Sequence, residues 1–282
     1  MNEIQQTILD IFREVDAVCD KLNVRYFAIG GTALGAIRHR GFIPWDDDLD
    51  IAMPVEDYSR FVVQAQRYLP EHLEIRTFES SGHTQNVFSK VVDTRTTNIE
   101  PVEKRYPDSY KGIYVDIMPM SGVPTGIQKN AFISKVALYG AILYGLPWKV
   151  NDRSTAKHKA LWLLSLPLKP FLSPMTVLKR WEGLLQSVPF DSADYVGYTW
   201  WPKLNKLIFP RKWFAESAKL PFEDTEIRMP AGYHEYLSQQ FGDYMKLPPV
   251  DQRVTHNGFI DLKHSYKDYQ RGLLAIPTSF GE

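Results

Sequence analysis

Four of the five residues from position 46 to position 50 are aspartates, in the order Asp-Asp-Asp-Leu-Asp. From Leu49 to Met53 apolar residues alternate with acidic or small ones, which is the period of a β-strand with two distinct faces. Asp48 and Asp50 would then project from the same face, close enough to share one hard cation such as Mg²⁺. Two such carboxylates repel each other and lose hydration on burial, so stability alone rarely explains them. The run therefore predicts a divalent-metal site for phosphoryl transfer.

Two other interpretations of this acidic run stay open. One is a solvated acidic turn, although Trp45, Leu49 and Ile51 are residue types that are usually buried. The other is a calcium-binding loop, which would need Gly in place of Ile51 and Glu in place of Asp57 and would lie between two helices.

A further acid, Asp116, stands alone in the apolar run Ile-Tyr-Val-Asp-Ile at positions 113–117. Burying a lone carboxylate is costly unless something pairs with it, and a metal ion or a reacting hydroxyl would explain its presence. We therefore expect Asp116 to join the acidic run as the third acid of the site. The alternative is an aspartate that caps a backbone turn before Pro119.

The glycine pair Gly30-Gly31, followed by Thr32, stands between a short apolar run and a helical pattern. Such a turn exposes backbone N–H groups to an anion, so we expect these three residues to bind a phosphate. Thr32 is also expected to cap the following helix. Among the cations near this turn, we expect Arg38 and Lys90 to bind a diphosphate.

Helical and strand-like patterns alternate through the first 120 residues, which predicts an α/β fold (α+β with a mixed sheet). The region from 126 to 188 reads as helical, with breaks at Pro147, Pro167, Pro170 and Pro174. The remaining elements are shorter, and the chain turns irregular after Pro249. We expect helices at 4–22, 33–38, from Pro54 to about 65, and 233–241, and strands at 26–29, 49–53, 73–78, 87–92, 113–118, 195–199, 218–222 and 226–229.

The charge balance and the cysteine content exclude several classes of function. Lys plus Arg and Asp plus Glu both total 33, so no overall basic field exists to bind nucleic acid. The single cysteine, Cys19, excludes an internal disulfide and a zinc site made of several thiolates. The first residues carry no signal-peptide pattern, so we expect a cytoplasmic location.

Two apolar runs, 136–148 and 161–172, are each too short to span a membrane, because a spanning helix needs about 20 apolar residues. We expect these runs to be buried in a helical lobe. The alternative is peripheral contact with a membrane surface, which would bring the protein to a lipid-linked acceptor.

The residues from 30 to 51 read GGTALGAIRHRGFIPWDDDLDI, and this stretch resembles the signature of the LicD family of phosphocholine transferases, to which fukutin-related proteins are similar. A second stretch, FGDYMKLPP at 241–249 followed by Arg253 and His256, is similar to the C-terminal motif of that family. The order of strand, glycine pair, helix and acidic strand also resembles the nucleotidyltransferase fold. The resemblance covers the first 120 residues and the region from about 200 to 256.

The resemblance implies a set of roles for these residues. Asp48, Asp50 and Asp116 would be the catalytic acids and metal ligands, with Asp46 as an added ligand, for Mg²⁺ or in its place Mn²⁺. Arg253 and His256 would bind substrate. The donor would be CDP-choline or another CDP-alcohol, and the acceptor a glycan of a cell-surface polysaccharide, teichoic acid or lipopolysaccharide precursor. We expect a nucleotidyltransferase-like catalytic core at 1–125, a helical lobe at 126–190, and a C-terminal part at 191–282 that completes the catalytic domain.

Three other functions are weighed against this one. A nucleotidyltransferase would use the same metal site to attach a nucleotide to a small acceptor. A glycosyltransferase would use the Asp-X-Asp pair to hold a nucleotide sugar, although the glycine turn before the strand counts against it. A binding protein without catalysis would be expected to lack one of the acids, and all of them are present.

Overall fold

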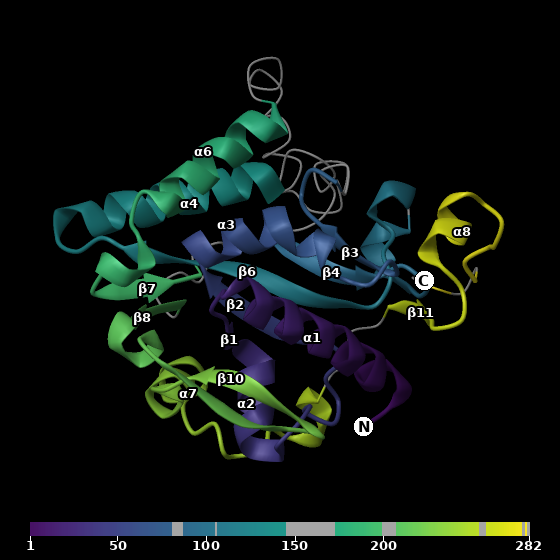
Figure 1. The fold of residues 1–282 in the computed structure, drawn as a ribbon, viewed down its shortest axis with the longest axis horizontal. Helices are drawn as coiled ribbons and strands as arrows, with labels where there is room; N and C mark the ends of the chain where they lie inside the picture. Colours follow the sequence, from purple (N-terminus) through teal and green to yellow (C-terminus); the bar gives the residue numbers. More distant parts are fainter. Residues whose placement is uncertain are drawn as a thin grey trace.

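The computed structural model describes residues 1–80, 87–104, 106–144, 173–198, 207–253, 258–277 and 280. Within these residues a mixed sheet of seven strands runs in the order β1-β2-β6-β4-β3, with β7 added to β6 and β8 to β7 (Figure 1). The β2–β6 pair is parallel and the other described pairs in this sheet are antiparallel. The strands are β1 (Phe27–Ala28), β2 (Asp50–Pro54), β3 (Leu73–Arg76), β4 (Ser89–Asp93), β6 (Tyr114–Val123), β7 (Tyr195–Gly197) and β8 (Ile208–Pro210).

Two helices, α1 (Glu3–Leu22) and α3 (Val55–Gln64), lie across one face of the sheet and contact each other (Figure 1). The predicted first helix is confirmed: Asn2 and Gln5 form a capping box at its start, and Asn23 ends it in the left-handed conformation. Its apolar stripe is buried in the main core. Both helices contact β6, and α3 also contacts β2. They therefore support the two strands that carry the predicted acids Asp50 and Asp116.

The opposite side of β1 and β2 is occupied by α2 (Gly30–His39) together with α7 (Tyr233–Phe241) and the hairpin of β9 (Ser217–Phe222) and β10 (Thr225–Pro230) (Figure 1). The bounds of α7 are those predicted from the sequence. Strands β7 and β8 also extend the main sheet from β6. Residues from the C-terminal third of the chain therefore surround the helix that follows the glycine turn.

Two further helices, α4 (Ile127–Tyr144) and α6 (Pro174–Gln186), pack on each other above α3 (Figure 1). Their shared core includes Trp181, and also Val55 and Val123 from the sheet region. Pro174 marks a helix boundary, as predicted, because it opens α6 with Ser173 as its cap. The predicted breaks at Pro147, Pro167 and Pro170 lie outside the described residues, as does the run 161–172. Among the helices that the structure describes, none has the length and apolar character needed to cross a bilayer.

A small outlying unit completes the described chain. Strand β11 (Phe259–Asp261) pairs with β5 (Thr97–Ile99), and α8 (Tyr266–Gln270) lies beside them (Figure 1). We expected irregular chain after Pro249 and no strand at 97–99, so these elements were missed. They are three to five residues long, and such short segments carry too few periodic positions to be recognised.

The structure corrects two local predictions, on Thr32 and Asp48, and excludes one alternative that had stayed open for Asp116. Thr32 is not the cap of α2, because the helix begins at Gly30 with Ile29 as its cap. Strand β2 begins at Asp50, so Asp48 precedes the strand rather than sharing its face. The turn before Pro119 does not exist, since β6 continues to Val123; its pairing with β4 ends at Ile117, so the missing N–H of Pro119 breaks no bond to β4.

Thr32 instead joins α2 to β2, because its buried Oγ1 accepts a hydrogen bond of 2.8 Å from the backbone N–H of Asp50. We expect Thr32→Val, which has nearly the same shape, to leave this N–H without a partner and to lower the free energy of unfolding by about 1–3 kcal/mol. Thr32→Ser, which keeps the hydroxyl, is the matched control. Urea denaturation measures both, and equal stability of the two variants would contradict this role of Thr32.

Candidate active site

Three charged residues form a row across three neighbouring strands. Asp50 of β2 lies directly opposite Asp116 of β6, and Lys90 of β4 lies opposite Asp116 on its other side. Residues paired in this way project from the same face of a sheet, with their Cβ atoms about 4.5–5.5 Å apart. The register therefore brings together two of the predicted acids and one of the predicted cations. We call this set the charge row.

Asp116 and Lys90 form a buried ion pair between Oδ1 and Nζ. Only 7% of Asp116 and 4% of Lys90 is exposed to solvent. The ammonium group of Lys90 also lies 3.6 Å from the centre of the Tyr114 ring, which is a cation–π contact. Lys90 was predicted to bind a diphosphate, and in this structure its contacts are with Asp116 and Tyr114.

The carboxyl groups of the charge row outnumber its cation. Burial raises the pKa of Asp50 well above its usual range, and the neighbouring carboxyls of Asp48, Asp116 and Asp46 raise it further. Burial also raises the pKa of Asp116, although the Lys90 ammonium opposes this shift. Repulsion between acids that are kept apart from water is what a bound divalent cation would relieve.

The glycine turn lies against these acids. A Cβ atom placed on Gly31 would stand 2.6 Å from Oδ2 of Asp46, and one on Gly30 would stand 3.4 Å from Oδ2 of Asp50. The backbone N–H of Gly30 donates a 2.8 Å hydrogen bond to the hydroxyl of Tyr236 on α7. The start of α2, which favours anions, is thus placed beside the charge row as the sequence predicted.

The part of the chain that carries these residues is similar to known proteins. The family model described as LicD/FKTN/FKRP, nucleotidyltransferase domain, matches residues 23–137, which include the glycine turn and the whole charge row. The lipopolysaccharide cholinephosphotransferase LicD of Haemophilus influenzae is 30% identical over 91% of this chain and 96% of its own length. The chain belongs to the LicD family. It is therefore a phosphotransferase enzyme with a nucleotidyltransferase-like fold.

Two other relatives match shorter stretches. The human ribitol 5-phosphate transferase FKRP is 47% identical over 45 residues, which cover 16% of this chain and 9% of that protein. The uncharacterized protein RP689 of Rickettsia prowazekii is 36% identical over 28% of this chain and 26% of its own length.

The acids of this LicD family site suit a hard cation by their chemistry, since carboxylate oxygens are the ligands that Mg²⁺ prefers. In the arrangement that the structure describes, however, no group of three or more His, Cys, Asp or Glu side chains is placed to hold a metal ion together. One reason is that Oδ1 of Asp116 is engaged with Lys90. Binding of a metal by all the predicted acids would require their carboxylates to draw together.

Two more predicted residues, Arg38 and Arg253, both bind the segment 244–248 at the other end of α2. Arg38 donates to the carbonyl oxygens of Tyr244 at 3.1 Å and Lys246 at 3.4 Å, within the predicted C-terminal motif. Arg253 lies over the ring of Trp45, with its guanidinium carbon 4.8 Å from the ring centre. Eight residues separate Gly30 from Arg38 along α2, so their backbones lie about 12 Å apart. The predicted substrate residue His256 lies outside the described residues.

Sequence reasoning missed two tyrosines of the site. Tyr114 lies two residues before Asp116 and hence on the same strand face, so the period of two could have identified it. Tyr236 bonds to Gly30 from a helix that is 206 residues away in the chain, and its hydroxyl lies 3.0 Å from that of Tyr198. No local signal could have found that contact.

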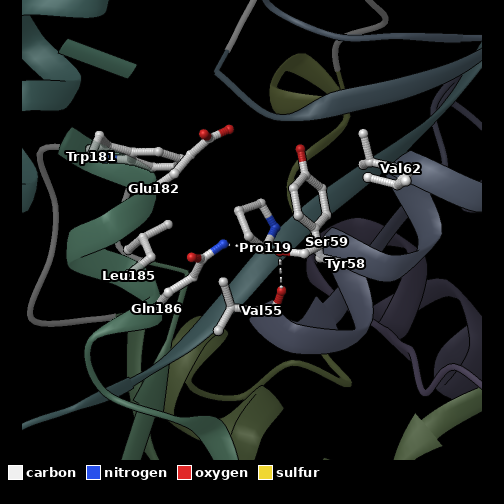
Figure 2. Close-up of a pocket in the computed structure, with 10 residues that line it drawn as sticks. Val55, Tyr58, Ser59, Val62, Pro119, Trp181, Glu182, Leu185 and Gln186 are labelled. Carbon is white, nitrogen blue, oxygen red and sulfur yellow. Dashed lines mark hydrogen bonds between the residues drawn. The ribbon is translucent and has the colours of Figure 1, made fainter. Parts of the chain in front are cut away.

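A separate pocket of about 230 Å³ lies between α3 and α6 (Figure 2). Tyr58, Trp181 and Glu182 line it, and the side chain of Gln186 donates a 3.2 Å hydrogen bond to Ser59 at its edge. Pro119 of β6 lines the side of the pocket that faces the sheet. It lies three residues after Asp116 on the same strand, so its side chain projects from the opposite face of the sheet. This pocket is not part of the charge row.

The raised pKa of Asp50 gives a stability prediction with a definite sign. A carboxyl whose pKa is higher in the folded state than in the unfolded state destabilises the fold as the pH rises through the folded pKa. In EDTA at pH 7 we therefore expect Asp50→Asn to unfold at a higher temperature than the wild type. The difference should disappear as the pH falls towards the ordinary aspartate pKa of about 3.9. Scanning calorimetry from pH 7 to pH 4 measures it, and a lower melting temperature at pH 7 would contradict the prediction.

Asp116→Asn should have the opposite effect on stability. It leaves the buried Lys90 ammonium without its counter-ion, and removing one member of a buried ion pair costs about 3–5 kcal/mol. The double variant Lys90→Met, Asp116→Asn should recover part of this loss, because it no longer buries a lone charge. A double-mutant cycle in urea measures the coupling. Additive losses would show that the pair is not coupled.

Proposed function

We propose that this LicD family enzyme transfers phosphocholine, or a similar phospho-alcohol, from a CDP-linked donor to a glycan hydroxyl and releases CMP. The glycan would be a precursor of a cell-surface polysaccharide, teichoic acid or lipopolysaccharide. The relatives support the choice of transferred group and acceptor, since one is a lipopolysaccharide cholinephosphotransferase and the other a ribitol 5-phosphate transferase. The observation that carries the proposal is the placement of the charge row against the glycine turn.

In this proposal Asp48, Asp50 and Asp116 hold Mg²⁺, with Asp46 beside them. When bound, the ion supplies positive charge that stabilises the diphosphate of the donor as its bond breaks. The excess of carboxyl groups over cations at the charge row supports this assignment.

The chain's own residues supply binding and proton transfer. The N-terminal amides of α2 and the glycine turn bind the donor phosphate. The acceptor oxygen forms a bond to the phosphorus that carries the alcohol, the bond from that phosphorus to the bridging oxygen breaks, and CMP leaves. The proton of the acceptor hydroxyl passes to the Asp116 carboxylate. Lys90 fixes the orientation of the Asp116 carboxylate for this transfer.

Products distinguish the competing functions. A nucleotidyltransferase would release pyrophosphate from a nucleoside triphosphate, and a glycosyltransferase would release a nucleoside diphosphate from a nucleotide sugar. The phosphotransferase alone would release CMP from a CDP-alcohol.

We expect the protein with Mg²⁺ to release CMP from one member of a panel of CDP-choline, CDP-ribitol and CDP-glycerol. Asp48→Asn and Asp50→Asn should each abolish this release, because each removes a charge that the proposed ion needs. Asp108→Asn, at an exposed position on a separate loop, is the matched control and should keep it. Chromatography of the nucleotide products measures the reaction. CMP release by Asp50→Asn at the wild-type rate, or pyrophosphate from CTP, would refute the proposal.

A further inference from the structure

Arg38 and Arg253 are two guanidinium groups that have no acidic partner in the part of the chain that the structure describes. Both side chains are placed at the same segment, because Arg38 donates to the carbonyl oxygens of Tyr244 and Lys246 and Arg253 donates to that of Pro248. Burial lowers the pKa of Arg38, and the positive charge of Arg253 lowers it further. Among the described residues no carboxylate lies within 4 Å of either group, whereas other arginines of this chain, such as Arg25 and Arg228, each pair with two aspartates. We call Arg38 and Arg253 the guanidinium pair.

The fold holds the guanidinium pair in place through neutral partners. Arg38 donates to the carbonyl oxygens of Tyr244 and Lys246, and Nε of Arg253 donates a 3.1 Å bond to the carbonyl of Pro248. The ring of Trp45 supports Arg253 from one side. Carbonyl oxygens and an aromatic face orient a guanidinium without cancelling its charge. These described partners therefore leave the charge of both guanidinium groups uncancelled, at the end of α2 opposite to the excess of acids.

We infer that the guanidinium pair binds an anionic group, a phosphate or a carboxylate, that is carried by the acceptor glycan. Guanidinium groups bind both kinds of anion through paired N–H donors, and two adjacent cations attract an anion more strongly than either alone. The inference rests on the proposed function, because it assigns the donor diphosphate to the charge row.

The position of the pair favours the acceptor over the donor. The backbone of Arg38 is about 12 Å along α2 from the glycine turn where the donor phosphate would bind. The two phosphates of a CDP-alcohol are directly linked, so they occupy one end of that span. A series of contacts connects the guanidinium pair to the charge row. Arg253 lies over Trp45, the next residue Asp46 lies against Gly31, and Gly30 lies against Asp50. An acceptor that reaches the charge row with its hydroxyl can place a second group at the pair.

Inorganic phosphate is a direct probe for this site. In EDTA and at constant ionic strength, we expect phosphate to raise the melting temperature of the wild-type protein in a saturable way. Arg253→Gln should need at least ten times more phosphate for half of the effect, and Arg253→Lys should lie between the two because it keeps the charge and loses the planar fork. Arg271→Gln, an exposed arginine beyond α8, is the matched control and should behave as the wild type.

The outcomes separate this inference from the proposed function. Equal phosphate responses of Arg253→Gln and the wild type, or no saturable response in the wild type, would overturn the inference. The same would follow if CMP without metal stabilised the wild type and not Arg253→Gln, because the pair would then belong to the donor site. CMP release from CDP-alcohols by the wild type is measured independently. Its absence, with phosphate binding intact, would refute the proposed function and leave the anion site in place.

Discussion

The register of β2, β6 and β4 sets the central constraint on this molecule, because it places Asp50, Asp116 and Lys90 side by side in a buried row. One cation cannot neutralise the surrounding carboxyl groups, so burial and mutual repulsion raise the pKa values of Asp50 and Asp116. A slip of one residue would send these side chains to the opposite face, against α3. The strand order and the packing of α1 and α3 on the sheet therefore determine the chemistry.

The same constraint explains why the site needs elements from distant parts of the chain. Asp50 is held by Thr32 of α2, and the turn at Gly30 is held by Tyr236 of α7. Arg38, at the other end of α2, binds the loop after α7. Helix α2 is thus fixed at both ends, with acids beside its start and the guanidinium pair beside its end. One helix spans the two charged regions that the proposed donor and acceptor would occupy.

Local patterns in the sequence predicted much of this arrangement. The period of two identified Asp50 as a strand residue, and an apolar run identified Asp116 as another. Helical spacing identified α1, and the bounds of α7 were also predicted. The failures have a common physical cause. Three interactions depend on the packing of segments 26 to 215 residues apart. They are the ion pair of Asp116 with Lys90, the hydrogen bond of Gly30 to Tyr236, and the electrostatic interaction of Arg38 with Arg253. Thr32 was assigned to the wrong role because α2 begins at Gly30, two residues before it.

Direct binding of a divalent cation tests the central claim most simply. Mn²⁺ can be titrated into the protein and its free concentration followed by electron paramagnetic resonance, with Mg²⁺ as competitor. The account predicts one saturable site in the wild type that Mg²⁺ displaces, and its loss in Asp50→Asn, whose fold would be verified by calorimetry. Wild-type Mn²⁺ affinity in a folded Asp50→Asn protein would contradict the claim that the charge row is a metal site.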